Sequence, residues 1–105
     1  MNSLRAARPA VWLQWREAVR GFREGMVLQR HWRNLRYHER CFTGAAAVSW
    51  LHRYLAGHAL FSADVSREQT VRLLAKFVQA GIIQEVRGRR GTAPPEFKDD
   101  SRLYR

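Results

Sequence analysis

The sequence predicts an α+β fold of the winged-helix type. The expected fold has a three-helix core, a basic β-hairpin arm between helices one and two, and a C-terminal two-stranded wing. Three observations predict it: helical spacing of apolar residues in three segments, a basic segment without helical phasing between the first two, and a β-branched run near the C-terminus. At 105 residues the chain fits one domain. We place that domain at residues 9–105 and expect residues 1–8 to be a flexible N-terminal segment.

The first helix is predicted from Pro9 to about Glu24. Apolar residues recur there at three- and four-residue spacing, namely Val11, Trp12, Trp15, Val19 and Phe22. Pro9 suits a first helical turn, where its missing N–H is not needed, and Gly25 is the expected stop. We expect Trp12 and Trp15 to anchor the core, together with Trp50 of the second helix.

Residues 26–42 lack helical phasing and predict two short strands joined by an irregular basic arm, with Asn34 near its tip. Thr43 is the expected N-cap of a second helix that starts at Gly44 and closes at Gly57. The inner face of this helix is expected to comprise Ala47, Val48, Leu51, Tyr54 and Leu55.

The third helix is predicted from a capping box, in which Ser66 and Gln69 each satisfy a backbone N–H of the other. Gly81 is expected to end this helix, whose core face is Val71, Leu74, Phe77 and Val78. The following residues, 82–86, are rich in β-branched side chains and predict the first wing strand. A turn-rich basic loop separates them from the second wing strand at Leu103-Tyr104.

The charge balance indicates an acidic partner. Nineteen Lys and Arg against nine Asp and Glu give a formal net charge of +10, which concentrates polyanions near the surface. Nucleic acid, anionic lipid headgroups and an acidic protein segment all satisfy this condition. Nearly all of the positive charge is Arg, which binds phosphate or carboxylate through two N–H groups at once.

Several classes of protein are disfavoured. The only cysteine, Cys41, rules out an internal disulfide framework and a Cys-based zinc site, so an intracellular protein is expected. No apolar run approaches the roughly 20 residues that would span a bilayer. The four histidines lack metal-ligand spacing, and no convergent acid, base or nucleophile indicates catalysis. We therefore expect no enzyme activity, no metal and no cofactor.

Residues 41–51 carry a family resemblance: an aromatic-x-Gly is followed by a small-residue helix start and Val-x-Trp-Leu. Further matches follow in order, with a basic arm at 30–36, the third helix at 66–77, the first wing strand at 81–83 and a closing strand at 97–105. The chain thus resembles the DEP family over nearly everything after Pro9, and is most similar to DEP domains that precede a Rho-GAP-like module. Ser49 departs from the pattern, because the family often has Asp there and any ion pair of that Asp is missing.

The resemblance implies a non-catalytic module that targets its parent protein to the plasma membrane or cell cortex in G-protein or Rho-type signalling. Its partners would be anionic phospholipids or a membrane-associated protein, such as a receptor or a G-protein pathway component. By position this role is expected at Arg30, Arg33 and Arg36, with Arg40 as a further candidate. Trp32 is expected to contribute an amphipathic ring, and burial of that ring in the core is the equally weighted alternative.

The wing loop contains a second basic cluster, which is a further candidate for partner binding. Arg87, Arg89 and Arg90 form that cluster.

Nucleic-acid binding through the third helix is the alternative function. It is disfavoured because the connector at 58–65 is longer than the one in a helix-turn-helix unit. Self-association is also open, with the first helix as the element that two copies would exchange.

Overall fold

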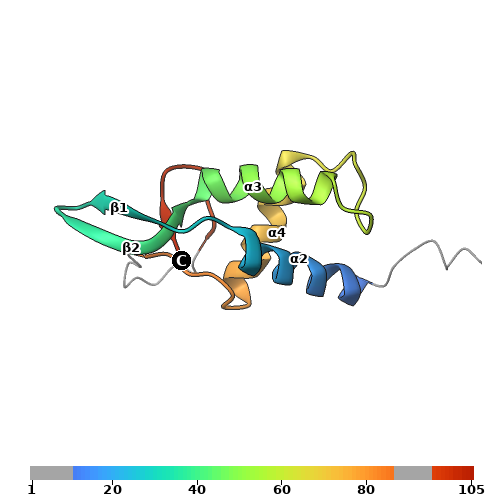
Figure 1. Ribbon diagram of the computed structural model, residues 1–105, viewed down its shortest axis with the longest axis horizontal. Helices are drawn as coiled ribbons and strands as arrows, with labels where there is room; N and C mark the ends of the chain where they lie inside the picture. Colours follow the sequence, from blue (N-terminus) through green and yellow to red (C-terminus); the bar gives the residue numbers. More distant parts are fainter. Residues whose placement is uncertain (1–10, 87–95) are drawn as a thin grey trace, which may run out of the picture.

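The computed structural model describes residues 11–86 and 96–105. Three helices, α2 (Val11–Gly25), α3 (Gly44–Ala56) and α4 (Arg67–Gln79), pack together, with α4 crossing between the other two (Figure 1). A hairpin of β1 (Gln29–Arg33) and β2 (Arg36–Thr43) projects from one end of this helical body. The predicted fold class, three helices with an arm between the first two, is confirmed. The N-terminal segment 1–8 lies outside the described residues.

Both predicted N-caps form. Thr43 Oγ1 accepts a hydrogen bond from the Ala46 N–H at 3.0 Å. Ser66 Oγ accepts from the Gln69 N–H at 3.0 Å, and Gln69 Oε1 accepts from the Ser66 N–H at 2.8 Å, which completes the capping box. Because each cap satisfies N–H groups that a helix leaves unpaired, these short motifs determine where α3 and α4 begin.

Aromatic rings from four elements meet at the centre of the core. The Phe22 ring contacts the rings of Phe42, Trp50 and Phe77 edge-on, with centroids 5.5, 5.9 and 5.6 Å apart. Around them lie further buried apolar residues from all three helices, among them Ala18, Ala47, Val48, Leu51, Leu55, Leu74 and Val78. Edge-to-face contacts add to the burial of apolar area, so Phe22 ties α2 to both other helices.

Trp12 does not anchor the core, contrary to the sequence prediction. Its side chain is 61% exposed, whereas Trp15, one turn later, packs edge-on against Phe77 with centroids 5.4 Å apart. Trp12 lies in the first turn of α2, and its ring contacts the guanidinium of Arg16 at 5.7 Å. The apolar face of the helix therefore extends beyond the part that is covered by the core.

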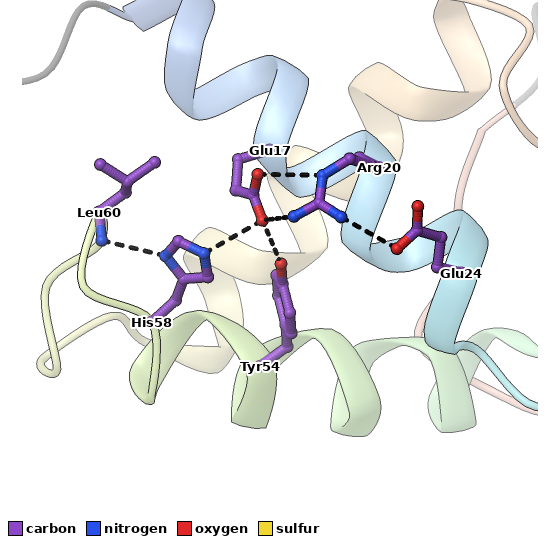
Figure 2. Close-up of polar contacts among 6 residues, drawn as sticks. All are labelled: Glu17, Arg20, Glu24, Tyr54, His58 and Leu60. Carbon is purple, nitrogen blue, oxygen red and sulfur yellow. Dashed lines mark hydrogen bonds and ion pairs between the residues drawn. The ribbon is translucent and has the colours of Figure 1, made fainter.

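A polar cluster links α2 to α3 and to the connector that follows it (Figure 2). The Tyr54 hydroxyl donates to Glu17 Oε2 at 2.7 Å, and His58 Nε2 lies 3.1 Å from the same oxygen. Arg20 forms an ion pair with Glu17 on α2. The hydrogen bond from Tyr54, followed by that from Arg20, lowers the pKa of Glu17 to about 2. This carboxylate is thus held ionised against the second helix.

The hairpin turns at Asn34, as predicted. Trp32 pairs with Tyr37 and Arg33 with Arg36, so Asn34 and Leu35 alone form the turn. Both have left-handed backbone angles, with φ of 53° and 66°. Two-residue hairpin turns with positive φ at both positions match the twist of the flanking strands. Asn tolerates this conformation better than Leu, so the tip is strained at Leu35.

The closing strand β3 (Leu103–Tyr104) pairs with β2, which gives an antiparallel sheet in the order β1-β2-β3. The sequence placed its partner at residues 82–86. That segment is not a regular strand; it meets β3 through an isolated bridge between Glu85 and Tyr104 and through two 2.9 Å backbone bonds between Gln84 and Arg105. The hydrogen bonds expected of the wing therefore form on one edge of β3, while its other edge joins the arm.

Candidate interaction surface on the arm

One face of the arm combines two aromatic rings with a guanidinium. The Arg30 guanidinium lies 4.8 Å from the centroid of the Tyr37 ring and pairs with Glu39, Nε to Oε2 at 3.2 Å. The rings of Trp32 and Tyr37 contact each other edge-on, with centroids 4.8 Å apart. We call the side chains of Arg30, Trp32 and Tyr37 the aromatic face of the arm.

Arg33 and Arg36 lie on the opposite face. Successive side chains of a strand point to opposite sides, and residues paired across two strands point to the same side. Arg33 follows Trp32 and pairs with Arg36. Its Nη1 donates to the Ser101 carbonyl at 2.7 Å, which turns it toward the closing segment. The structure thus divides the three arginines that the sequence grouped together.

The end of the arm exposes large apolar side chains. Trp32 is 54%, Leu35 85% and Tyr37 57% exposed, so Trp32 is not a core residue. Arg36 and Arg40 are also exposed, and neither forms an ion pair within the described residues. Contiguous exposed apolar side chains with a polar rim are typical of contact sites for proteins or membranes.

Leu35 was not among the candidates from sequence. The available signal was the two-residue turn itself, since a turn at positions 34 and 35 places both residues at the point of the arm farthest from the helices (Figure 1). The other predicted cluster, Arg87, Arg89 and Arg90, lies outside the described residues.

Cys41 is buried beneath the arm. Its Sγ donates to the His38 carbonyl at 3.3 Å and lies 3.4 Å from His31 Nδ1. Burial raises the pKa of the Cys41 thiol, so it stays protonated at neutral pH, where a thiolate nucleophile would have to be ionised. In the described ranges no group of three His, Cys, Asp or Glu side chains could hold a metal ion. None of the helices in those ranges is long and apolar enough to cross a bilayer.

Known proteins resemble the chain in sequence and in fold. The DEP family model, described as the domain found in Dishevelled, Egl-10 and Pleckstrin, matches residues 25–105. DEP domain-containing protein 1A of Danio rerio is 43% identical over 91 residues, and DEP domain-containing protein 1B of Homo sapiens is 41% identical over 91 residues. The match covers 87% of this chain in both cases, but only 11% and 17% of those proteins.

The solution structure of the DEP domain of mouse pleckstrin superposes with a TM-score of 0.62. That superposition covers 91% of this chain and 87% of the pleckstrin chain at 16% sequence identity, so it supports the fold. The family model extends from the end of α2 through the arm, both further helices and the closing strand. The chain therefore belongs to the DEP family, whose domains are non-catalytic signalling modules.

Proposed function

We propose that this domain targets its parent protein to the plasma membrane or cell cortex by binding anionic phospholipids through the β1–β2 arm, in G-protein or Rho-type signalling. The observation that carries the proposal is the exposure of Trp32, Leu35 and Tyr37 at the end of the arm, with Arg30 on the same face as the two rings and Arg36 exposed on the opposite face. A surface that is both aromatic and basic suits the headgroup region of a membrane, where aromatic rings and basic side chains are each stabilised.

The basic and the apolar side chains would contribute to the free energy of membrane binding in different ways. Each Arg close to an anionic lipid surface contributes about 1 kcal/mol, and this contribution weakens as salt is added. Burial of a large apolar side chain contributes roughly 1.5–3 kcal/mol and is not screened by salt. Leu35, the most exposed of the three, has the most surface to bury. Binding through this surface should therefore have a salt-sensitive and a salt-resistant component.

The shape of the domain supports contact through the tip. The hairpin extends away from the three helices, so its end can meet a flat surface while the helical body stays clear of it (Figure 1). Both Arg36 and Arg40 are exposed, and Arg36 lies on the face opposite to Trp32 and Tyr37, so basic side chains accompany the apolar residues at the end of the arm. A membrane-associated protein, such as a receptor or a G-protein pathway component, would be bound by the same Arg chemistry and is the alternative partner.

Nucleic-acid binding has less support. A winged helix that reads DNA commonly places its recognition helix in the major groove, with basic side chains on that helix. The exposed side of α4 carries Arg72 and Lys76 but also Glu68. Arg67, at the start of α4, is engaged by Asp99, Nε to Oδ2 at 2.8 Å. The arm has four arginines against Glu39, whereas α4 has Arg67, Arg72 and Lys76 against Glu68, so the arm has the higher formal charge.

Liposome co-sedimentation tests the proposal. Vesicles of phosphatidylcholine with rising fractions of phosphatidylserine should bind the domain increasingly and in a salt-sensitive way. An Arg30→Glu/Arg33→Glu/Arg36→Glu variant should lose that binding, and a Trp32→Ser/Leu35→Ser variant should lose the part that persists at high salt. Arg53→Glu/Arg72→Glu/Lys76→Glu, which changes the net charge equally at exposed positions of α3 and α4, is the matched control.

If the triple variant sediments with vesicles as well as the parent does, the arm is not the lipid site. If neither binds lipid but short duplex DNA binds at physiological salt, nucleic-acid recognition replaces the proposal. Gel filtration with light scattering on the same samples tests whether two copies exchange α2, and a monomeric mass would exclude it.

A further inference from the structure

A cavity lies along the arm, on the side opposite the aromatic face, and extends from Asn34 at the turn to the closing segment at the base of the arm, for which we call it the basal cavity. It has a volume of about 440 Å³ and is bordered by β2, by the segment around Glu85 and by β3. Its lining residues are Arg33, Asn34, His38, Glu85, Val86, Arg102 and Leu103. Ligand pockets commonly have about 300–1,000 Å³, so this basal cavity can hold a small molecule or a headgroup.

His38 leaves a polar atom without a partner beside this cavity. The residue is 7% exposed, and its Nε2 is buried with no hydrogen-bond partner among residues 11–86 and 96–105. A buried donor or acceptor that stays unpaired is costly, so such groups are usually satisfied by a protein atom, a water or a ligand. A neutral imidazole can donate from Nε2, and an anionic oxygen would accept that hydrogen bond.

Two arginines favour an anion as the occupant. Arg33 uses Nη1 for the Ser101 carbonyl, which leaves its other N–H groups available. Arg102 has only long ion pairs, with Nε 3.8 Å from Glu85 and Nη2 3.7 Å from Asp100. Charge-assisted hydrogen bonds to a carboxylate are usually about 2.7–2.9 Å long. The guanidinium of Arg102 is therefore loosely held and can turn to a stronger acceptor.

We propose that the basal cavity binds a phosphate monoester, with Arg33 and Arg102 contacting the phosphate oxygens and the His38 ring turning so that its buried Nε2 donates to one of them. Guanidinium groups match the spacing of phosphate oxygens, which favours this group over a single-atom anion. Glu85 and Asp100, which both pair with Arg102, oppose the ligand through their negative charge, so binding depends on the N–H groups that Arg33 and Arg102 offer to the phosphate oxygens. The phosphate could belong to a soluble metabolite or to a lipid headgroup. The site shares no residue with the aromatic face, but Arg33 also belongs to the triple variant that tests the arm, so the Trp32→Ser/Leu35→Ser variant is the one that tests the arm without altering this site.

An NMR titration with glycerol 3-phosphate tests the inference. The imidazole resonances of His38 and the side-chain resonances of Arg33 and Arg102 should shift and saturate. Arg102→Gln should weaken affinity about tenfold or more, because it removes a charged hydrogen-bond donor. Glu85→Gln should strengthen affinity, because it removes the opposing charge. Arg72→Gln on α4 is the matched control and should bind as the parent does.

The inference is wrong if the shifts do not saturate, if they occur only at Arg30, Trp32 and Tyr37, or if Arg102→Gln binds as tightly as the parent. Circular dichroism of each variant shows whether it is folded. Loss of vesicle binding in the Trp32→Ser/Leu35→Ser variant alongside a flat titration would leave the arm proposal intact and remove this one.

A vesicle-binding experiment distinguishes the two sources of the phosphate, a lipid headgroup and a soluble metabolite. Vesicles with phosphatidylinositol 4-phosphate are compared with vesicles of equal charge that contain phosphatidylserine, whose phosphate is a diester. A preference for the first that disappears in Arg102→Gln identifies a lipid headgroup. Saturable binding of glycerol 3-phosphate with no such preference identifies a soluble ligand. Both results support a phosphate monoester in the basal cavity.

Discussion

The Tyr54 hydroxyl donates a 2.7 Å hydrogen bond to Glu17 Oε2 and so joins α3 to α2 across 37 positions of sequence. Desolvation and the hydrogen bond to Glu17 raise the pKa of Tyr54 to about 12, while the pKa of Glu17 falls to about 2. Opposite shifts in the two partners are expected when an ionised acceptor faces a neutral donor. The contact thus stabilises the ionised form of Glu17 in the folded state.

Glu17→Gln should lower the free energy of unfolding at pH 7. Because the folded-state pKa of Glu17 lies below its ordinary value of 4.5, its ionisation stabilises the fold above about pH 4.5, and this contribution is lost as the pH falls toward 2. Urea unfolding across this range should show the parent and Glu17→Gln converging in stability at low pH. Glu24→Gln, which removes only an exposed partner of Arg20, is the control and should change little. A difference that stays constant down to pH 2 would contradict the prediction.

Phe22→Ala should destabilise the domain by about 3–5 kcal/mol, the usual cost of removing a buried phenyl ring. Phe22 is 3% exposed and its ring contacts three other aromatic rings. Domains commonly unfold with about 5–15 kcal/mol, so a large part of the stability depends on this residue. Val27→Ala, at a position 57% exposed, should change urea unfolding by less than about 0.5 kcal/mol. If the two substitutions lowered the free energy of unfolding equally, Phe22 would not be a central residue of the core.

Ser66→Ala should cost about 1 kcal/mol, because it leaves the Gln69 N–H at the start of α4 without its acceptor. Ser66→Asp keeps an acceptor in the same place and should retain most of the stability. Thermal unfolding of the three proteins distinguishes a lost cap from a general effect of substitution. If Ser66→Asp were as unstable as Ser66→Ala, the cap would not be the cause.

Ser49→Asp should stabilise the domain by up to about 1 kcal/mol, the upper range for an exposed ion pair. Arg67 Nη1 donates to Ser49 Oγ at 3.1 Å and also pairs with Asp99. A carboxylate at position 49 would therefore meet a guanidinium that is already in place. Urea unfolding at low and high salt measures the gain, which salt should reduce. The absence of any salt dependence would show that the gain does not come from the ion pair.

Local signals in the sequence predicted most of the helical core. Ser66 with Gln69, Thr43 before Gly44, and Asn34 at the turn each act through neighbours a few residues away, so their roles can be read from short stretches of sequence. Periodicity predicted the core faces less completely. Thr70 was not assigned to the core face but is fully buried. Its hydroxyl can be buried because it donates to the Ser66 carbonyl at 3.0 Å.

Contacts between distant residues were not predictable in the same way. The pairing of Phe42 with Tyr104 joins positions far apart in the chain, and no local pattern indicates that β3 pairs with β2 on one edge while residues 84–86 occupy the other. The division of the arm arginines was also not predicted. It depends on the register of the hairpin, in which Arg33 pairs with Arg36 and Trp32 with Tyr37. Nearer the helices, the register shift between Gln29 and His31 and the left-handed backbone angle of Arg40 interrupt strict alternation along the strands. The basal cavity was not predictable either, because His38 of the arm and Arg102 of the closing segment line it together although they are far apart in the chain.

The strand order leaves β1 at the edge of the sheet, with one side bonded to β2 and the other without a neighbouring strand among the described residues. An open edge is a template on which further copies can add and polymerise. The strand β1 is only five residues long and carries two arginines. Like charges on approaching copies would repel each other along that edge. The positive charge that we propose brings the arm to an anionic surface would thus also protect a projecting hairpin from fibrillar self-assembly.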